Sequence, residues 1–521
     1  MKYLYIIVFI TTVCFSQSEH DARMLGMSDA YTTLVTGYNA VGVNPAALAD
    51  NKFSINLFSA NANIKNNFLS LSRYNDINGS DLEDISSANY YSKSNILELI
   101  DGESINLTGK FIVPAPGINI ASLNYALSAK LYTYVDLSVP EAFMDLMLNG
   151  NEISRAYLLN MRGEAVSYAE YGISYAHKFK NFSLGATLKY LQGLFYFNMY
   201  DTEEEGSSIT TTPTGLIGSG NYVIEQAFGG SGIGLDIGFL TSQNKNGWRF
   251  GTSIINIGGN IIWDSDNLTR NLLGSTLESV LPLRQNEYYF IDFEIDTLDA
   301  SLLFSGDYEQ IFSSSSYAVG IFSDIPTDLF SQITEVCESP NLDGGCDSQN
   351  YEDLNGNGVW DPDPYILINQ NFSNTLSEDQ IIQLSDGSWI VPSDGLSESN
   401  LSSSNVKSIK LDHPTYLRVG LSKNIVSEDI LLAADLICGL DEMFGNSKKF
   451  KLSFGSEINK LKNFPIRLGL SFGGSTGSSS SIGFGYRYKF LSIDFARSYN
   501  NSLILHKALG AKYSFGISLN F

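Results

Sequence analysis

The stretch Tyr513-Ser-Phe-Gly-Ile-Ser-Leu-Asn-Phe521 alternates between apolar residues and small or polar ones. Successive side chains of an extended strand point to opposite faces, so a period of two places every apolar side chain on one face. The same alternation recurs upstream in residues 464–473, 481–489 and 417–422. Residues 414–521 therefore predict consecutive strands of about ten residues, each with one apolar and one polar face.

Two architectures use strands of this kind. In a soluble extracellular β-sandwich, such as an adhesin, the apolar faces form a core. In a membrane barrel, the apolar faces meet lipid and the polar faces line the lumen. The aromatic Phe521 on the apolar face resembles the C-terminal assembly signal of bacterial outer-membrane barrels. We therefore predict an all-β fold, a transmembrane antiparallel β-barrel of about 14 strands within a range of 12–16.

The composition agrees with a barrel. Aromatic residues make up 12% of the 521 residues, and 46 glycines accompany them. Charged residues make up only 17%, against roughly 25% in a typical soluble domain. The net charge is nevertheless −24, which argues against nucleic acid as a partner, because nucleic-acid binding needs basic patches. The sequence contains no enzyme motif with complete spacing, so we expect no catalytic activity.

The connections between the expected strands alternate in length. Lys180-Asn181 and Asn244-Lys-Asn-Gly247 form tight turns, and Asn-Gly is a strong hairpin signal. Polar connectors 201–226, 264–287 and 299–413 lie between other strands. Short periplasmic turns and long extracellular loops are typical of outer-membrane barrels. Residues 52–74, which precede this region, suggest a hairpin.

The N-terminus predicts export. Lys2 and an apolar run that ends at Phe15 precede Ser16, which is typical of a secretory signal peptide. We therefore divide the chain into a signal peptide (1–16), a hatch segment (17–50) and a barrel (51–521) whose largest extracellular insertion is 299–413. The expected location is the outer membrane of a Gram-negative bacterium after Sec-type export, with membrane lipid around the barrel.

Residues 22–48 carry a more specific pattern. Arg23-x-x-Gly-Met27-x-x-Ala-Tyr31 is followed by Asn44-Pro-Ala-x-Leu48. This pattern resembles the N-terminal signature of the FadL-like outer-membrane proteins, which include fatty-acid transporters and the PorV-type barrels of type IX secretion. One departure is Ser28-Asp29, where a pair of glycines is common.

The resemblance implies that this segment folds into the barrel as a plug, called the hatch. The candidate hatch and transport residues are Arg23, Gly26, Met27, Tyr31, Asn44, Pro45 and Ala46. A short N-terminal helix with a proline turn is the simpler alternative.

One motif indicates a metal. Oxygen-bearing side chains alternate in the range 353–363, with a glycine after the third, as in the first half of an EF-hand loop. The candidate Ca²⁺ ligands of this structural, extracellular site are Asp353, Asn355, Asn357, Val359 through its carbonyl, Asp361 and Asp363. Pro364 stands where an EF-hand has its bidentate Glu, so a solvated turn is the alternative. Cys337 and Cys346 flank a short polar loop in an exported chain, which predicts a disulfide.

Two functions follow from this interpretation. The first is passive transport of hydrophobic small molecules through a plugged lumen, as the FadL resemblance implies. The second is a PorV-like interaction or assembly role, in which the outer loops dock an exported protein. An apolar site in the lumen would favour the first function, and a stable protein partner would favour the second.

Overall fold

The structure is a computed structural model. It describes residues 21–50, 53–100, 104–150, 152–201, 206–213, 215–263, 409–425, 429–440, 448–461 and 463–521. Between residues 264 and 408 it describes only short strands. Among the described residues, no helix is long and apolar enough to cross a membrane.

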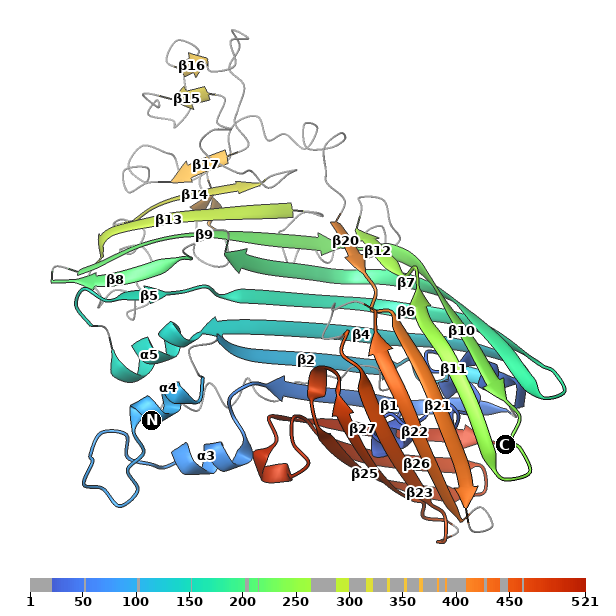
Figure 1. Ribbon diagram of the computed structural model, residues 1–521. Helices are drawn as coiled ribbons and strands as arrows, with labels where there is room; N and C mark the ends of the chain where they lie inside the picture. Colours follow the sequence, from blue (N-terminus) through green and yellow to red (C-terminus); the bar gives the residue numbers. More distant parts are fainter. Residues whose placement is uncertain are drawn as a thin grey trace.

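Fourteen antiparallel strands pair side by side until the last meets the first, so the barrel is closed (Figure 1). Closure is made by β1 and β27, whose register runs from Ser54 opposite Asn520 to Lys65 opposite Gly510. The strands are β1 (Ser54–Asn66), β2 (Ser104–Pro114), β4 (Tyr125–Pro140), β6 (Arg162–Lys178), β7 (Phe182–Asp201), β10 (Ser231–Thr241), β11 (Trp248–Ile257), β21 (Tyr416–Ile425), β22 (Ile430–Gly439), β23 (Lys451–Ile458), β24 (Ile466–Gly473), β25 (Ser479–Tyr488), β26 (Leu491–Tyr499) and β27 (Gly510–Asn520).

The two faces of the barrel wall have the polarity of a membrane protein. On β24, Leu468 and Leu470 are 47% and 43% exposed, whereas Arg467 and Ser471 are fully buried. The same inversion holds on the other wall strands, where large apolar side chains are exposed and charged or small polar ones are buried. Because a soluble sandwich would bury its apolar face, this pattern confirms the predicted transmembrane barrel.

The strand connections differ at the two ends of the barrel. The connections β6–β7, β10–β11, β21–β22 and β25–β26 are short turns, and the start of β1 and the end of β27 lie at that same end. The opposite end carries the longer segments, including α3 (Leu71–Ile77), α4 (Lys93–Glu98) and α5 (Glu141–Asn149). We therefore assign the short-turn end to the periplasm and the other end to the cell exterior. Smaller elements are β3 (Ile120–Ser122), η7 (Gly474–Thr476) and η8 (Leu505–Lys507).

The wall is taller on one side, where β6 and β7 have 17 and 20 residues while β23 and β24 have 8. Beyond the point where β10 pairs with β7, β9 (Gly215–Phe228) takes over the upper part of β7. The sheet of the wall continues beyond this edge (Figure 1). The further strands of this continuation are β5 (Ala156–Leu158), β8 (Ser208–Thr212), β13 (Glu287–Leu298), β14 (Ser315–Ile321) and β17 (Tyr365–Ile368).

Two expectations for connecting segments were wrong. The polar connector 201–226 contains β8 and most of β9, which pair as an antiparallel hairpin from Ser208 opposite Ser219 to Thr212 opposite Gly215. The expected hairpin in 52–74 is one strand, β1, followed by helix α3. The Asn66 side chain accepts the backbone N–H groups of Phe68 and Leu69 at 3.0 and 2.6 Å, and Ser70 then caps α3 at Arg73.

Several predictions lie outside the described residues. They are the signal peptide, Cys346, and the Ca²⁺ ligands Asn355, Asn357, Val359, Asp361 and Asp363. Cys337 and Asp353 lie in a two-stranded sheet of β15 (Glu335–Cys337) and β16 (Tyr351–Asp353), of which only the backbone is described. A second such sheet contains β18 (Ile382–Gln383) and β19 (Trp389–Ile390). The calcium site and the disulfide therefore remain predictions.

Placing a charge on the outer face tests the orientation of the wall. We expect Leu470→Arg to lower the free energy of unfolding in lipid vesicles by about 2–4 kcal/mol, because the guanidinium must leave water for hydrocarbon. Denaturant titration in vesicles measures this loss, and Leu470→Ala, which adds no charge, is the control. A loss for Leu470→Arg no larger than that for Leu470→Ala would contradict a lipid-facing position.

Candidate functional site

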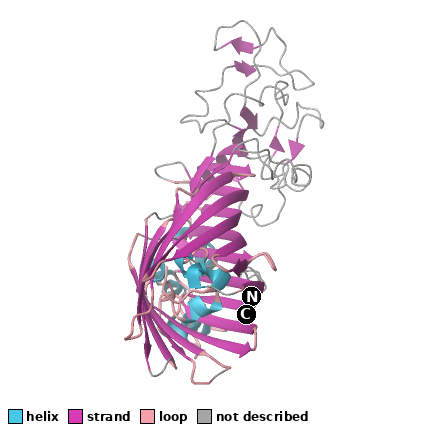
Figure 2. Ribbon diagram, turned by 90° about the vertical axis from the view of Figure 1, so that its right-hand side faces the viewer, coloured by secondary structure: helices cyan, strands magenta, loops and turns pink. Residues whose placement is uncertain are grey.

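Residues 21–50 are the described part of the hatch. They lie inside the barrel, where Figure 2 shows helices surrounded by the wall. The hatch begins with α2 (Ala22–Gly26), whose first turn is capped by Asp21 Oδ1, which accepts the N–H of Met24 at 2.7 Å. It continues through η1 (Gly37–Ala40) and η2 (Pro45–Asp50). Ser28 and Asp29 have φ angles of 50° and 72°, a left-handed conformation that glycine adopts more readily than other residues. Nearly every hatch residue is buried, so the segment fills the lumen as a plug.

Ion pairs connect the hatch to the wall. Arg23 donates two hydrogen bonds to Glu457, from Nε to Oε2 at 2.8 Å and from Nη2 to Oε1 at 2.9 Å. Glu457 Oε2 also accepts from Nε of Arg467 at 2.6 Å, so one carboxylate joins a hatch arginine to a wall arginine. Asp29 forms a second ion pair with Lys451. Bidentate arginine–carboxylate pairs are strong and directional, so they fix the position of α2.

Asp435 holds the middle of the hatch. Its Oδ2 accepts the backbone N–H groups of Tyr31 and Thr32 at 3.0 and 2.8 Å. Arg418, which is fully buried, donates to the carbonyl of Asp29 at 2.8 Å and lies 3.4 Å from Asp435 Oδ2. Charged wall side chains therefore satisfy the backbone of an irregular segment that has no sheet partner.

Glycines on the inner wall allow the hatch to pack closely. A Cβ atom at Gly455 would lie 2.7 Å from Cβ of Met27, and one at Gly469 would lie 2.5 Å from the backbone nitrogen of Ser28. We call the lumen-facing glycines in such contact with the hatch the glycine belt: Gly185, Gly238, Gly251, Gly420, Gly455, Gly469 and Gly483. Because any larger residue there would meet the hatch backbone or side chains, the belt and the hatch are complementary in shape.

The structure places all seven predicted hatch residues in this interface. Arg23 is partly exposed and the other six are buried. Asn44 donates to the carbonyls of Thr32 at 3.2 Å and Phe239 at 3.1 Å and accepts the N–H of Ala46 at 3.2 Å. Gly26 lies against Gly483 and Arg467. The positions of these residues are therefore known, while their part in transport remains a prediction.

Sequence analysis did not single out the wall residues that hold the hatch. Glu457, Asp435, Arg418 and Lys451 are far from the hatch in sequence, and each contact spans at least 386 residues. One signal was present: Arg418, Asp435 and Glu457 are charged residues in the lumen-facing rows of their strands. A charge in such a row needs a partner inside the lumen, although the pattern cannot identify that partner.

A buried charged layer lies beside the hatch on the tall side of the wall. Lys189 Nζ lies 3.1 Å from Glu170 Oε2 and 3.0 Å from Asp236 Oδ2, and all three side chains are at most 1% exposed. Lys130 Nζ donates to the carbonyl of Val41 at 2.8 Å, which connects this layer to the hatch. Ionisable groups at membrane depth are retained when they pair inside the protein, so the layer is a polar barrier across this part of the lumen.

An apolar layer follows on the extracellular side of the charged layer. On β4 the inward row runs from Lys130 to Tyr132 and Tyr134, and on β6 it runs from Glu170 to Tyr168 and Val166. Strands β12 (Asn260–Trp263) and β20 (Ile409–Asp412) add further apolar side chains to this layer. Its members are Ile112, Tyr132, Tyr134, Val166, Tyr168, Leu191, Tyr196, Ala227, Ile261, Trp263, Ile409 and Leu411.

The aromatic side chains of this layer contact one another. The rings of Tyr132 and Tyr168 stack with centroids 5.0 Å apart. His413, between β20 and β21, contacts Tyr168 edge-on and is hydrogen-bonded to its hydroxyl at 2.9 Å. The rings of Tyr196 and Trp263 lie 6.0 Å apart. The lumen is therefore aromatic on its extracellular side, unlike the polar lumen of a water-filled porin.

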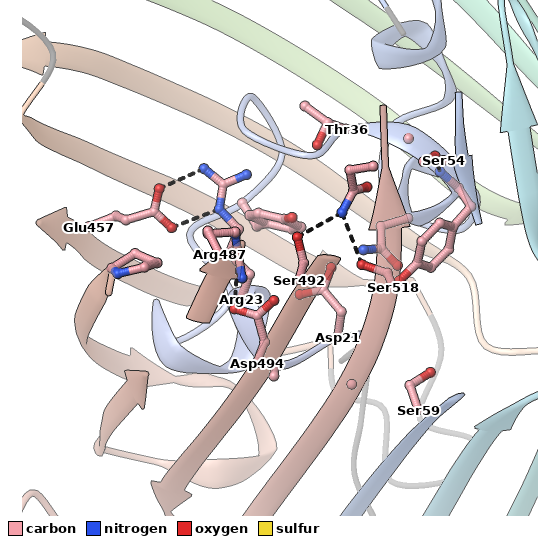
Figure 3. A pocket seen from close by; sticks show the side chains of 18 of the residues that line it. Asp21, Arg23, Thr36, Ser54, Ser59, Glu457, Arg487, Ser492, Asp494 and Ser518 are labelled. Atoms are coloured by element: carbon pink, nitrogen blue, oxygen red, sulfur yellow. Dashed lines mark hydrogen bonds and ion pairs between the residues drawn. The ribbon is translucent and has the colours of Figure 1, made fainter. Parts of the chain in front are cut away.

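A pocket of about 530 Å³ opens at the periplasmic end, between the hatch and strands β23 to β27 (Figure 3). Most of its lining is polar, and includes Asp21, Arg23, Glu457, Arg487 and Asp494. Burial raises the pKa of the Asp21 carboxyl, and the nearby carboxylate of Asp494 raises it further. Burial likewise raises the pKa of Tyr38, another lining residue, to about 12.

The fold and the filled lumen define the class of this protein: an outer-membrane β-barrel with an internal plug. Residues 45–319 match the model of a family of unknown function, DUF5723. Because the match covers more than half of the 521 residues, the chain belongs to this family. No curated protein matches the sequence.

Similar solved structures include a transporter and a channel. A FadL homologue of Pseudomonas aeruginosa is 13% identical, with 98% of this chain and all of that chain covered and a TM-score of 0.43. The toluene transporter TodX of Pseudomonas putida is 11% identical, with coverages of 97% and 99% and a TM-score of 0.45. The monoaromatic hydrocarbon channel CymD is 10% identical, with coverages of 97% and 99% and a TM-score of 0.42. Identities this low concern the fold alone, and the PorV-type resemblance remains a prediction.

Proposed function

We propose that this protein is a passive channel for hydrophobic small molecules, with the apolar layer as the first site that such a molecule reaches from outside. The observation that carries this proposal is the division of the lumen into layers. Buried aromatic and aliphatic side chains fill it on the extracellular side, and charged groups and the hatch fill it on the periplasmic side. Transfer of an apolar molecule from water to such a surface is favourable by roughly 25 cal/mol per Å².

The layers also discriminate between hydrophobic molecules and polar solutes. Ions and polar solutes gain nothing from an aromatic surface, and the buried hatch occupies the lumen below it. Onward movement of a bound molecule requires the hatch to shift. The segment Asn44–Pro45–Ala46 lies against Gly185, Gly238 and Gly251 of the glycine belt, where a small displacement changes contacts with three wall strands. Hatch movement is therefore the gating step of the proposed mechanism.

Uptake by intact cells tests the proposal. The probe is N-phenyl-1-naphthylamine, which fluoresces when it enters apolar surroundings. Cells that contain the protein should take it up faster than cells without it. Leu191→Asn places an amide in the apolar layer, and we expect it to slow the protein-dependent uptake by roughly tenfold, equivalent to about 1.4 kcal/mol.

The control for this variant is Leu158→Asn, an identical exchange at an exposed position on β5. It should leave uptake unchanged. Equal uptake with and without the protein would refute the channel. Native mass spectrometry of the protein in mild detergent gives a second readout: a retained hydrophobic molecule supports the channel, and a retained exported protein without one supports the PorV-like alternative.

A further inference from the structure

Two buried charged side chains in the periplasmic pocket have a polar atom without a partner. Asp21 is 8% exposed, and its Oδ2 has no hydrogen-bond partner among the described residues, although its Oδ1 caps α2. Arg467 is fully buried, and its Nη2 likewise has no partner in the part of the chain that the structure describes. Both residues line the pocket, one from the hatch and one from β24.

The hydrogen bonds of the other Arg467 nitrogen atoms show which kind of partner Nη2 lacks. Its Nε donates to Glu457 at 2.6 Å and its Nη1 donates to Asp494 at 2.6 Å. The free Nη2 can only donate, so it needs an acceptor, and the free Oδ2 of Asp21 needs a donor while the carboxylate is ionised. Leaving such groups buried without partners is unfavourable, so a molecule that supplies both a donor and an acceptor would be stabilised here.

The surrounding side chains favour a zwitterion, a molecule with one positive and one negative group. Arg487 and Lys489 also line the pocket, as do the carboxylates of Glu457 and Asp494, the latter 2.9 Å from Nη2 of Arg487. The lining therefore carries groups of both signs. Asn39, Asn459 and Asn520 supply amide groups that can donate or accept. The volume of about 530 Å³ lies within the range of small-molecule sites. Few lining residues are apolar, so the pocket does not match the hydrophobic molecules proposed for the apolar layer.

We propose that this pocket binds a small zwitterion, a free α-amino acid or a short peptide, from the periplasm. The ammonium group of the ligand pairs with Oδ2 of Asp21, and its carboxylate accepts from Nη2 of Arg467. The ligand thereby contacts both the hatch and the wall, beside the Arg23–Glu457 ion pair. This site is on the opposite side of the hatch from the apolar layer, and its existence does not depend on the proposed channel function.

Calorimetric titration of the full-length protein in mild detergent tests the site, with trialanine as the probe. Two blocked forms serve as ligand controls: N-acetyl-trialanine lacks the ammonium group and trialanine amide lacks the carboxylate. We expect trialanine to bind and each blocked form to bind at least about tenfold more weakly, because each loses one charged hydrogen bond.

Asp21→Asn is the matching protein variant. Asparagine caps helices as well as aspartate does, so α2 keeps its first-turn hydrogen bond while the charge that pairs with the ammonium group is lost. Trialanine affinity should fall by roughly tenfold or more. Asp412→Asn, at an exposed carboxylate of β20, is the control and should leave the affinity unchanged.

Three results would overturn the proposal. They are no binding of trialanine at millimolar concentration, equal binding of trialanine and its blocked forms, and an unchanged affinity in Asp21→Asn. The blocked ligands need no variant, so the test stands even if Asp21→Asn fails to assemble. Loss of hydrophobic-dye uptake is a separate readout, so failure of this site and failure of the channel are distinguishable.

Discussion

Replacing Glu457 with Gln should release the N-terminal part of the hatch from the barrel wall. Glu457 is buried between the guanidinium groups of Arg23 and Arg467, with three hydrogen bonds of 2.6–2.9 Å. A neutral amide leaves the buried Arg467 with Asp494 as its ion-pair partner and removes the ion pair of the partly exposed Arg23. Removal of one partner from a buried ion pair costs about 3–5 kcal/mol. Most of this loss should fall on hatch docking, because the barrel strands keep their backbone hydrogen bonds.

Two measurements report hatch release. Trypsin should cleave after Arg23 in the folded variant but not in the wild type, and single-channel recordings should show a larger ion conductance. Heat-dependent mobility on gels shows whether the barrel itself remains folded. The double variant Arg23→Gln/Glu457→Gln should recover part of the loss, because it removes the positive charge that has lost its ion pair. Cleavage and conductance equal to the wild type would contradict this role for Glu457.

Replacing Gly455 with Leu should prevent the hatch from docking where Met27 packs against β23. A Cβ atom at this position would lie 2.7 Å from Cβ of Met27 and 2.9 Å from the Met27 carbonyl oxygen. The clash involves backbone as well as side chain, so rotation of Met27 cannot relieve it. We expect a loss of about 3 kcal/mol or more in hatch stability, at the upper end for overpacking. Hydrogen exchange of hatch amides measures the loss.

A glycine on the wall without a close neighbour supplies the control. A Cβ atom at Gly516, on β27, would have its nearest contact at 3.6 Å, from Ser59, so Gly516→Ala should leave hatch protection unchanged. Met27→Gly should restore part of the protection in the Gly455→Leu background, because it removes the Cβ and Cε atoms of Met27 that a Cβ at position 455 would meet. Wild-type protection in Gly455→Leu would mean that the glycine belt is not needed for docking.

The strand pattern could be predicted because each wall strand contacts lipid along its own length. On β27, Tyr513 and Phe515 are exposed while Lys512 and Ser514 are buried, as the alternation in the sequence indicated. The predicted strand number agrees with the closed barrel for the same reason. In segment 201–226, Pro213 and Gly215 mark a turn, but the polar composition of β8 and β9 concealed the hairpin. In segment 52–74 no turn signal supported a hairpin, and capping by Asn66 and Ser70 begins helix α3 instead.

The N-terminal motif identified the residues of the hatch but not what holds them. Arg23 and Asn44 were recognised by their spacing, whereas Glu457 and Phe239, which contact them, lie hundreds of residues away in the chain. The periplasmic pocket is another case. Asp21 and Arg467 line it together because α2 packs against the ends of β23 to β27, and no local pattern encodes that proximity.

The sequence by itself determined the membrane-facing surface, the strand period and the presence of a hatch motif, since each is a local property of the chain in a given solvent. Only the tertiary structure decided how the lumen is filled. The ion pairs of the hatch, the glycine belt, the charged and apolar layers and the pocket all arise where strands distant in sequence bring their inward rows together. Barrel closure fixes those neighbours through hydrogen bonding of whole strands, so the contacts inside follow from the register of the barrel rather than from any single segment.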